Sequence, residues 1–545
     1  MKGDYILKGN AIFDSVSNNP FSGFIVVQGN KIAAIEKGEE SLSKYCGENT
    51  KIIECGDRLI TAGFIDAHMH FFDGIFQNSK FMCRDLFSCK SAKECVQRIN
   101  DFAKAHPEYE TITGMGWFIP LWEDKTLPTK EMLDEIEPDR PVYLMCADGH
   151  SFWLNSKALE ESQIDPNRIL LFGEIEKDEN GNANGVLHEL DACAPCTVNA
   201  QKVPEKEREK MILEFVSILS ENGITSTTDM AVLPQPIPVT DDLKAVKKLE
   251  DEGMLNLRLY LYPPLGTTDD FTIVKEYSSL FCSDKLRVAG LKAFVDGVHG
   301  NHTALLIEPY LDMPDYKGES FYDYDFYIKQ VSAANKAGFG VKLHCCGEGA
   351  VEWALDAYEY SHKHLDKNNI RNSIEHVEAI RPEQLVRFTR NNVTATIQPL
   401  HLMYEGDILY SILGSERAQY QYAVNTMMDN NINVAFSSDY PVADFNPFVN
   451  IYFAVTRCDL EGHPVEKIST QAISIAQALK AYTIGSAYCL NMEQKIGTLE
   501  VGKLADIIVL DRNLFDVDKN SICNTKVDLT MVDGVIAHNN IFKEV

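Results

Sequence analysis

Short runs of alternating apolar and polar residues, separated by tight-turn residues, predict β structure at both ends of the chain. Near the N-terminus, two strand-like runs within residues 23–35 flank Gly29-Asn30, a two-residue hairpin signal. Residues 502–511 and 529–536 have the same texture. Neither end carries enough strands for a stable sandwich alone. We therefore predict that residues 1–58 and 491–545 combine into one small β-sandwich domain.

Between residues 59 and 490 the pattern changes to short apolar strands that alternate with amphipathic helices. This alternation is typical of a parallel sheet with helical crossovers. Eight strands are expected, the number that closes a barrel. They are residues 59–65, 225–229, 257–262, 289–295, 340–343, 372–375, 394–397 and 433–436. The predicted fold class is α/β, with a (β/α)8 TIM barrel over residues 59–490.

The stretch after the first barrel strand is too long for one βα loop. From His70 to Thr225 the chain has strand-like runs of its own, at 111–115 and 141–145, together with helical segments. We predict an insertion at about residues 75–215 that forms a lid over the C-terminal mouth of the barrel. Its aromatic residues Trp117, Phe118, Trp122, Phe152 and Trp153 favour a substrate with an apolar portion, although core packing explains much of this set equally well.

The net charge and the hydropathy of the chain indicate which kinds of binding partner to expect. The net charge of −29 disfavours nucleic acids and anionic membranes, because phosphate groups would be repelled. No window of the sequence is long and apolar enough for a transmembrane helix, and residues 1–5 lack the apolar core of a signal peptide. We therefore expect a cytoplasmic protein whose partner is a small-molecule substrate.

The fourteen cysteines are scattered, and most lie within apolar runs. Without a secretion signal, reduced core thiols are expected. Cys193 and Cys196 form a CxxC pair that would suit a redox role or half of a zinc site. No second CxxC or nearby CxxH accompanies them, so two buried structural thiols are the preferred interpretation.

Polar residues stand at the ends of five predicted barrel strands. Barrel active sites lie at the C-terminal ends of their strands, so these residues are expected to share one mouth. Residues two apart in an extended segment point to the same side, so His68 and His70 can bind one ion. The full set is His68, His70, Lys292, His344, His376 and Asp439.

Each of these residues has an ordinary structural explanation when taken singly. A strand histidine is often a hydrogen-bonded core residue, an aspartate before a loop is often a cap, and Lys292 could be a salt-bridged lysine. Together they would require several costly buried polar groups in one layer of the barrel. A metal site explains them all, and imidazole and carboxylate ligands suit zinc, iron, manganese or nickel.

The motifs resemble the amidohydrolase superfamily, and most of all its YtcJ-like and N-substituted formamide deformylase-like branch (amidohydrolase family 3). The opening motif Gly-Phe-Ile-Asp-Ala-His-Met-His at 63–70 and the tail at 497–506 both match. The resemblance spans nearly the whole chain. Further matching segments are 114–117, 148–155, 292–297, 344–348, 374–376, 398–399 and 438–441. One departure is Glu348, where this branch usually has aspartate.

The resemblance implies a divalent metal cofactor, most simply Zn²⁺, with one or two ions. In the two-ion arrangement, His68, His70 and Asp439 hold one ion, and His344 and His376 hold the other. Metal-bound hydroxide would attack the substrate, and Asp439 would act as the catalytic base and then as the acid.

Lys292 has a special place in this arrangement. A protonated lysine has three donors and no acceptor, so it cannot ligate a cation. The resemblance implies that Lys292 is carboxylated and bridges the two ions. The alternative is one ion, with Lys292 remaining an amine that pairs with an acidic neighbour or with the substrate.

Further polar residues match or lie beside the family motifs and are candidates for substrate binding. The insertion supplies three of them and the barrel loops supply the rest. They are Trp117, His150, Glu189, His302, Glu348, Gln398 and His401.

The predicted activity is hydrolysis of a non-peptide C–N bond in an N-acyl, N-formyl or cyclic amide. The alternatives are a metal-dependent deaminase of a heterocycle and, from another class, a non-catalytic binding protein on the same barrel. Lys292 favours the amide hydrolase over the deaminase. By family analogy the chain is compatible with a homo-oligomer.

Overall fold

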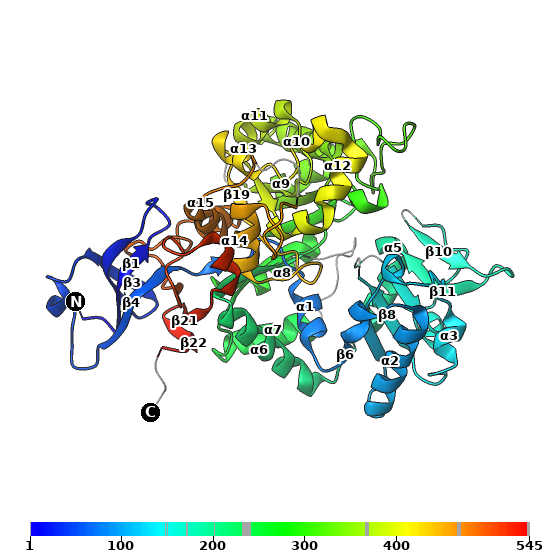
Figure 1. Ribbon diagram of the computed structural model, residues 1–545, viewed down its shortest axis with the longest axis horizontal. Helices are drawn as coiled ribbons and strands as arrows, with labels where there is room; N and C mark the ends of the chain where they lie inside the picture. Colours follow the sequence, from blue (N-terminus) through cyan, green and yellow to red (C-terminus); the bar gives the residue numbers. More distant parts are fainter. Residues whose placement is uncertain are drawn as a thin grey trace. The chain divides into compact units, whose positions relative to one another are not determined.

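The computed structural model describes residues 2–147, 149, 151–170, 173–200, 202–230, 241–365, 370–465 and 470–541. The chain divides into two compact units, and each is described by itself. Unit one comprises residues 1–71 and 216–545, and unit two comprises residues 72–215. Figure 1 shows the elements of both units, coloured along the sequence.

A seven-stranded sheet in unit one contains strands from both ends of the chain, in the order β22-β21-β20-β4-β1-β2-β3. β2 and β3 pair antiparallel, and Gly29 at their turn has a φ of 58°, which confirms the predicted hairpin. The strands are β1 (Tyr5–Phe13), β2 (Phe21–Gln28), β3 (Lys31–Lys37), β4 (Lys51–Ala62), β20 (Ile507–Leu510), β21 (Val527–Val532) and β22 (Val535–Asn539).

Both faces of this sheet are covered where its N-terminal strands lie. Along β1, Ile6 and Leu7 belong to two different apolar clusters, because successive side chains point to opposite faces of a strand. β4 and β20 pair directly, with Thr61 opposite Ile508. The described strands from both ends therefore form one sheet, and the described residues do not show the two-sheet sandwich that we predicted.

The predicted barrel strands fall into two parallel sheets. Their orders are β14-β13-β12-β5 and β15-β16-β17-β18-β19. Each of the eight predicted strands overlaps an observed one. The first sheet has β5 (Phe64–Ile65), β12 (Ile224–Met230), β13 (Arg258–Tyr262) and β14 (Leu286–Val288), and the second has β15 (Gly290–Phe294), β16 (Gly340–Cys345), β17 (Asn372–His376), β18 (Val393–Ile397) and β19 (Val434–Phe436).

The two parallel sheets are connected at both margins by isolated hydrogen bonds. On one side, Lys292 N donates to Pro263 O at 2.9 Å, and on the other, Asp439 N donates to His68 O at 2.8 Å. The closed barrel that we predicted is thus not present as one continuous sheet. Part of the reason is Pro263-Pro264, which follows β13 and has no N–H groups to extend its ladder.

The first predicted barrel strand is shared between two sheets. Residues 59–62 belong to β4 in the seven-stranded sheet, whereas residues 64–65 form β5 in the first parallel sheet. The change occurs at Gly63, where a Cβ atom would lie 2.3 Å from the Thr225 side chain. Only glycine fits this close crossing.

Helices follow most of the parallel strands, and Figure 1 shows α9, α10 and α11 packed beside one another. Amphipathic patterning accounts for α11, whose Leu385 and Phe388 are buried while Glu383 and Arg390 are exposed. The helices of unit one are α7 (Asp241–Asp251), α8 (Thr272–Leu280), α9 (Tyr324–Ala337), α10 (Glu348–Lys363), α11 (Pro382–Asn391), α12 (Leu402–Ala418), α13 (Val424–Asp429), α14 (Pro447–Thr456), α15 (Ile475–Lys480) and α16 (Ser486–Cys489), while α1 (Phe71–Asn78) and α6 (Glu205–Glu221) span the boundaries with unit two.

Unit two contains a six-stranded sheet in the order β10-β11-β9-β8-β7-β6. β7 and β8 overlap the strands predicted at 111–115 and 141–145. The elements are β6 (Met82–Cys83), β7 (Ile112–Trp117), β8 (Val142–Cys146), β9 (Ser151–Leu154), β10 (Glu174–Lys177), β11 (Ala183–His188), α2 (Ala92–Ala105), α3 (Lys130–Asp134), α4 (Ser156–Glu161) and α5 (Glu189–Ala200). Throughout the described part of the chain, no helix combines the length and apolarity needed to cross a membrane.

Candidate metal centre

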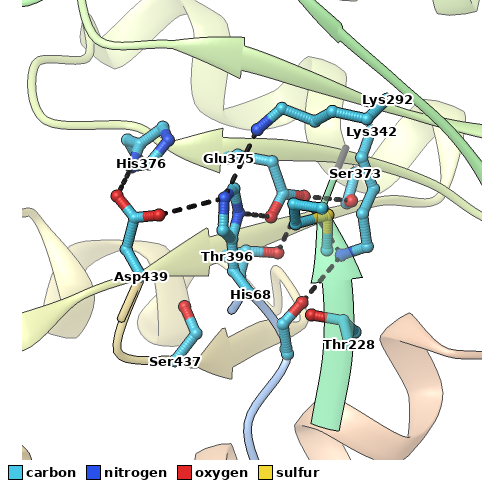
Figure 2. Close-up of polar contacts among 12 residues, drawn as sticks. His68, Thr228, Lys292, Lys342, Ser373, Glu375, His376, Thr396, Ser437 and Asp439 are labelled. Carbon is cyan, nitrogen blue, oxygen red and sulfur yellow. Dashed lines mark hydrogen bonds and ion pairs between the residues drawn. The ribbon is translucent and has the colours of Figure 1, made fainter. Parts of the chain in front are cut away.

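Two histidines and an aspartate converge where β5 and β19 end. Nε2 of His68 lies 3.3 Å from Oδ1 of Asp439, and Nε2 of His70 lies 3.2 Å from the same oxygen. His68 is fully buried, and Asp439 is 6% exposed. Figure 2 shows Asp439 and His68 facing each other. These are the three residues of the predicted first ligand set.

The outer hydrogen bonds of the two imidazoles establish which nitrogen carries the proton. Nδ1 of His68 lies 2.5 Å from Oε2 of Glu375, and Nδ1 of His70 lies 2.7 Å from the carbonyl oxygen of Met230. A carbonyl and an ionised carboxylate only accept, so each Nδ1 donates and each Nε2 presents a lone pair. Oδ1 of Asp439 is buried and accepts no hydrogen bond. Three lone-pair donors thus face one point, as metal ligands do.

Asp66 holds the backbones of this group together. Its carboxylate accepts hydrogen bonds from the backbone N–H of His68 at 3.2 Å and from the Ser438 hydroxyl at 2.6 Å. The backbone N–H of Ser438 donates to the same side chain at 3.1 Å. Asp66 therefore links the segment that carries His68 to the segment that carries Asp439.

Lys292 lies beside the first ligand set. Its side chain is 1% exposed, and Nζ is 3.3 Å from Nε2 of His68 and 4.7 Å from the ring centroid of Phe294. Burial lowers the pKa of Lys292 to about 8, although nearby carboxylates oppose the shift. A larger fraction of this amine is therefore neutral near physiological pH than in an exposed lysine.

His344 and His376 form a second pair beside the first. Their ring centroids are 4.3 Å apart, and those of His68 and His376 are 4.9 Å apart. Nδ1 of His376 lies 2.9 Å from Oε1 of Gln398, and Nε2 of His344 lies 3.2 Å from the carbonyl oxygen of Gly297. The structure thus brings every predicted ligand into one region of unit one.

Buried imidazoles in this region favour the neutral form that a metal requires. Burial, together with the charge of Lys292, lowers the pKa of His68 to about 4. Burial and the neighbouring His344 lower the pKa of His376 well below its usual range. Neither ring needs to lose a proton at neutral pH before it can bind a cation.

The possible ligand atoms form groups that differ from the two ligand sets implied by the resemblance. Among the described residues, three groups have ligand atoms within 4.8 Å of one another: His68, His70 and Asp439; Asp296, His344 and Cys346; and His376, Glu378 and His401. The first matches the predicted set. Asp296 in the second accepts backbone N–H groups from Leu305, Cys346 and Gly347, so its oxygens are already occupied.

A buried ionic network on the Nδ1 side of His68 positions its ring. Oε1 of Glu375 accepts hydrogen bonds from Lys342 Nζ at 3.2 Å, Ser373 Oγ at 2.5 Å and Thr396 Oγ1 at 3.2 Å (Figure 2). Burial alone would raise the pKa of Glu375, but Lys342 and His68 outweigh it and lower the pKa well below its usual range. The ionised Glu375 therefore fixes both the orientation and the tautomer of His68.

Comparison with known proteins supports the class of metal-dependent hydrolases. The amidohydrolase family model matches residues 51–538. The chain belongs to the amidohydrolase family. Putative amidohydrolase YtcJ of Bacillus subtilis is 26% identical over 98% of this chain and 99% of its own, and N-substituted formamide deformylase of Arthrobacter pascens is 23% identical over 96% of both chains.

A solved structure agrees with the fold of this amidohydrolase. It is an uncharacterized metal-dependent hydrolase from Pyrococcus horikoshii, with 25% sequence identity and a TM-score of 0.76. The match covers 94% of this chain and 99% of that chain. The amidohydrolase fold and the predicted membership of the YtcJ-like and formamide deformylase-like branch are thereby confirmed.

Two of the predicted substrate residues lie next to His376, a candidate metal ligand of this amidohydrolase. Gln398 is fully buried and connects His376 to Ser437, to which its Nε2 donates at 2.9 Å. His401 lies parallel to His376, with a centroid distance of 6.2 Å and an interplanar angle of 13°. Their contact with substrate stays a prediction.

Glu348 and His302 have other partners in the barrel loops. Glu348 is 2% exposed and lies 3.2 Å from Arg381, which accounts for the longer carboxylate at this position as an ion-pair partner. His302 lies 2.9 Å from Asp312. His302 lies directly after the turn that contains His299.

The remaining candidates belong to unit two. Trp117 is 2% exposed, donates its indole N–H to the carbonyl of Leu144, and packs with Trp122 and Trp153, so it forms part of the core of that unit. Glu189 begins α5 with a φ of 67°. His150 lies outside the described residues.

The cysteine pair has the properties of structural thiols. Cys193 and Cys196 are buried in the core of unit two, and the thiol of Cys193 donates to the carbonyl oxygen of Leu187. Burial raises the pKa of Cys196 to about 12, so its thiol stays protonated and weakly reactive.

Sequence reasoning missed two polar residues that support the site, Glu375 and Lys342. Each is buried within a parallel strand and follows directly after an apolar residue, Ile374 before Glu375 and Val341 before Lys342. A charged residue in such a run is itself a signal, because it must find a partner. The acid before His376 and the lysine before Leu343 could have been paired on that ground.

Proposed function

We propose that this amidohydrolase hydrolyses a non-peptide C–N bond of an N-formyl, N-acyl or cyclic amide, using a divalent ion held by His68, His70 and Asp439. The carrying observation is that two Nε2 lone pairs and the unpartnered Oδ1 of Asp439 meet at one buried point. The relative named N-substituted formamide deformylase supports C–N hydrolysis. Zinc suits this nitrogen and oxygen donor set best.

A divalent ion held by these residues would supply two effects, a pKa of bound water lowered from about 15.7 to about 7 and polarisation of the substrate carbonyl. The protein residues then have separate tasks. Asp439 receives the proton of the attacking water and delivers it to the leaving amine. Its Oδ2 lies 3.9 Å from His376, so the carboxylate is held on two sides. Glu375 keeps His68 in the ligand tautomer throughout.

We propose that Lys292 is carboxylated, in which case its carboxylate, together with His344 and His376, would supply ligands for a second ion. Its burial and lowered pKa favour the neutral amine, the form that reacts with carbon dioxide. In the one-ion alternative, the unmodified amine faces the substrate. We also infer that the two parallel sheets act as one barrel around this site, since the hydrogen bonds at both margins join them.

The proposal is tested with purified protein of measured metal content and a panel of N-formyl amines, N-acyl amino acids and cyclic ureides. Release of an amine together with a carboxylate, dependent on bound metal, is the expected result. Release of ammonia from heterocycles would establish the deaminase instead. Absence of turnover over the whole panel with metal-loaded protein would contradict the proposal and favour a binding protein.

A further inference from the structure

Gln398 is enclosed by protein, and both ends of its side-chain amide have a partner. Its exposed fraction is 0%. Oε1 lies 2.9 Å from Nδ1 of His376, and Nε2 donates to Oγ of Ser437 at 2.9 Å. A contact between Gln398 and substrate requires the residues that cover it to move. The contacts that Gln398 makes in this structure concern a candidate metal ligand instead.

His376, Gln398 and Ser437 come from the ends of three neighbouring parallel strands. His376 is the last residue of β17, Gln398 directly follows β18, and Ser437 directly follows β19. The backbone N–H of Ser437 donates to the carbonyl oxygen of Ile397 at 3.1 Å, which extends the pairing of the last two strands by one residue. Because these parallel strands end at the same edge of their sheet, the chain places an amide between an imidazole and a hydroxyl.

The backbone conformation of His376 makes the direction of its ring depend on such a contact. Its φ of 75° lies in the left-handed region, which residues other than glycine seldom adopt. A conformation of this kind costs roughly 1–3 kcal/mol and persists where surrounding contacts hold it. Among the residues that the structure describes, Gln398 is the hydrogen-bond partner of the His376 ring. The amide therefore fixes the ring at a point where the backbone alone is unfavourable.

The amide of Gln398 also decides which ring nitrogen of His376 carries the proton. A histidine binds a cation through a nitrogen that has no proton, so a ligand histidine keeps its single proton on the other nitrogen. The amide oxygen only accepts, so Nδ1 of His376 donates to it and Nε2 keeps its lone pair. A reversed amide would turn its N–H towards Nδ1 and leave the proton on Nε2. Ser437 accepts from the N–H end and holds the amide in the first orientation.

His376 and His68 differ in the charge of the partner that orients them. Nδ1 of His68 lies 2.5 Å from Glu375, whereas Nδ1 of His376 faces the neutral amide of Gln398. A carboxylate partner makes an imidazole a stronger metal ligand, because it stabilises the positive charge that the ring takes on when it binds a cation. A cation bound through His376 is therefore held less tightly than one bound through His68.

Other carboxylates near His376 do not remove this contrast. Oδ2 of Asp439 lies 3.9 Å from Nδ1 of His376, and the ligand atoms of Glu378 and His376 lie within 4.8 Å of each other. Within the described part of the chain, neither carboxylate hydrogen-bonds the ring. Asp439 belongs to the first ligand set, and Glu378 pairs with His299 at 2.8 Å.

We propose that Gln398 is the positioning residue of His376 and that its neutral amide makes the second ion the more weakly bound of the two. The inference rests on the proposed function, because it takes His376 as a ligand of that second ion. Gln398 then has for His376 the place that Glu375 has for His68. Ser437 contributes by orienting the amide.

The test is a titration of the metal-free, full-length protein with Co²⁺ in bicarbonate buffer, followed by visible absorption. The wild type should bind two ions in two steps, of which the second is weaker. Gln398→Met keeps the length of the side chain without an amide oxygen, and it should weaken the second step roughly 10–100-fold. Gln398→Glu keeps the acceptor and adds charge, so it should strengthen the second step. The first step should be the same in all three proteins.

A second buried glutamine provides the matched control. Gln384 also has an exposed fraction of 0%, and its amide contacts Arg381 and Glu352 instead of the ring of a candidate ligand. Gln384→Met should lower the melting temperature and leave both steps of the titration unchanged. If Gln398→Met does not fold, Ser437→Ala, which releases the other end of the amide, should weaken the second step in its place.

The assignment is overturned if folded Gln398→Met, or Ser437→Ala in its place, binds the second ion as tightly as the wild type does. It is also overturned if Gln398→Met and Gln398→Glu lose the same affinity, because a side chain that only fills space predicts this equality. Two steps of equal affinity in the wild type would refute the role of the neutral amide.

The two proposals fail separately. Two-step binding that responds to Gln398, without turnover of any amide, leaves the positioning role in place and refutes the proposed hydrolysis. Turnover of a formamide by wild-type protein that binds a single ion leaves the hydrolysis in place and refutes the role of Gln398.

Discussion

Nδ1 of His68 and Oε2 of Glu375 are 2.5 Å apart, and both side chains are completely buried. The same carboxylate also holds the ammonium of Lys342, so one glutamate serves a candidate metal ligand and a buried cation together. The orientation and tautomer of His68 therefore depend on the negative charge of Glu375.

Glu375→Gln should weaken metal binding roughly 10–100-fold, because the neutral amide orients His68 less firmly and leaves Lys342 without a counter-charge. Competition with a chromophoric chelator measures the affinity. Glu383→Gln, on the exposed face of α11, is the control. Unchanged affinity in Glu375→Gln would show that His68 does not need its partner.

Asp439→Asn should lose roughly a hundredfold or more of kcat, since the amide cannot receive the proton of the attacking water. The change should exceed any loss of bound metal. Measurement of kcat and metal content on the same sample separates the two effects. Near-normal turnover of metal-loaded Asp439→Asn would disprove its role as the base.

Carboxylation of Lys292 should rise with pH. With a pKa of about 8, roughly a tenth of this amine is neutral at pH 7 and roughly nine tenths at pH 9. Only the neutral amine attacks carbon dioxide, so the carbamate signal in ¹³C spectra with labelled bicarbonate should grow over this range. Lys292→Ala should lack the signal, and a wild-type protein that lacks it with metal bound would favour the one-ion arrangement.

Arg258→Met should destabilise unit one by roughly 3–5 kcal/mol, because it leaves the buried carboxylate of Asp506 without a positive counter-charge. Arg258 is fully buried and binds Asp506 through Nε at 2.6 Å and Nη2 at 2.9 Å, and Asp533 through Nη2 at 3.0 Å. Urea denaturation followed by fluorescence measures the loss. Arg512→Met removes a partly exposed pair with Asp511 and should cost less than about 1 kcal/mol.

Most of the candidate metal ligands, though not Lys292, could be singled out because each is a polar residue at the end of an apolar run. His68, His344, His376 and Asp439 all follow this rule, and the parallel arrangement of the strands brings their ends together. Their supporting residues follow no such rule. Glu375 and Lys342 lie within the strands, and the partner of each comes from a neighbouring strand that only the folded chain identifies.

The sheet boundaries were less predictable than the strands. Residues 59–65 form one apolar run, and nothing in its pattern shows that Gly63 divides it between two sheets. The same holds for the buried pair of His299 and Glu378, whose side chains are 2.8 Å apart although they follow different strands, β15 and β17.

The division of one strand at Gly63 has a consequence for the order of synthesis. His68 lies a few residues beyond β4, and β4 pairs on one side with β20, which begins at Ile507. Buried Arg258 likewise has no Asp506 to pair with until residue 506 has been synthesised. A nascent chain on the ribosome therefore lacks the strand that pairs with β4 until β20 has been synthesised. We expect the candidate metal site to bind its ion firmly only after that point of translation.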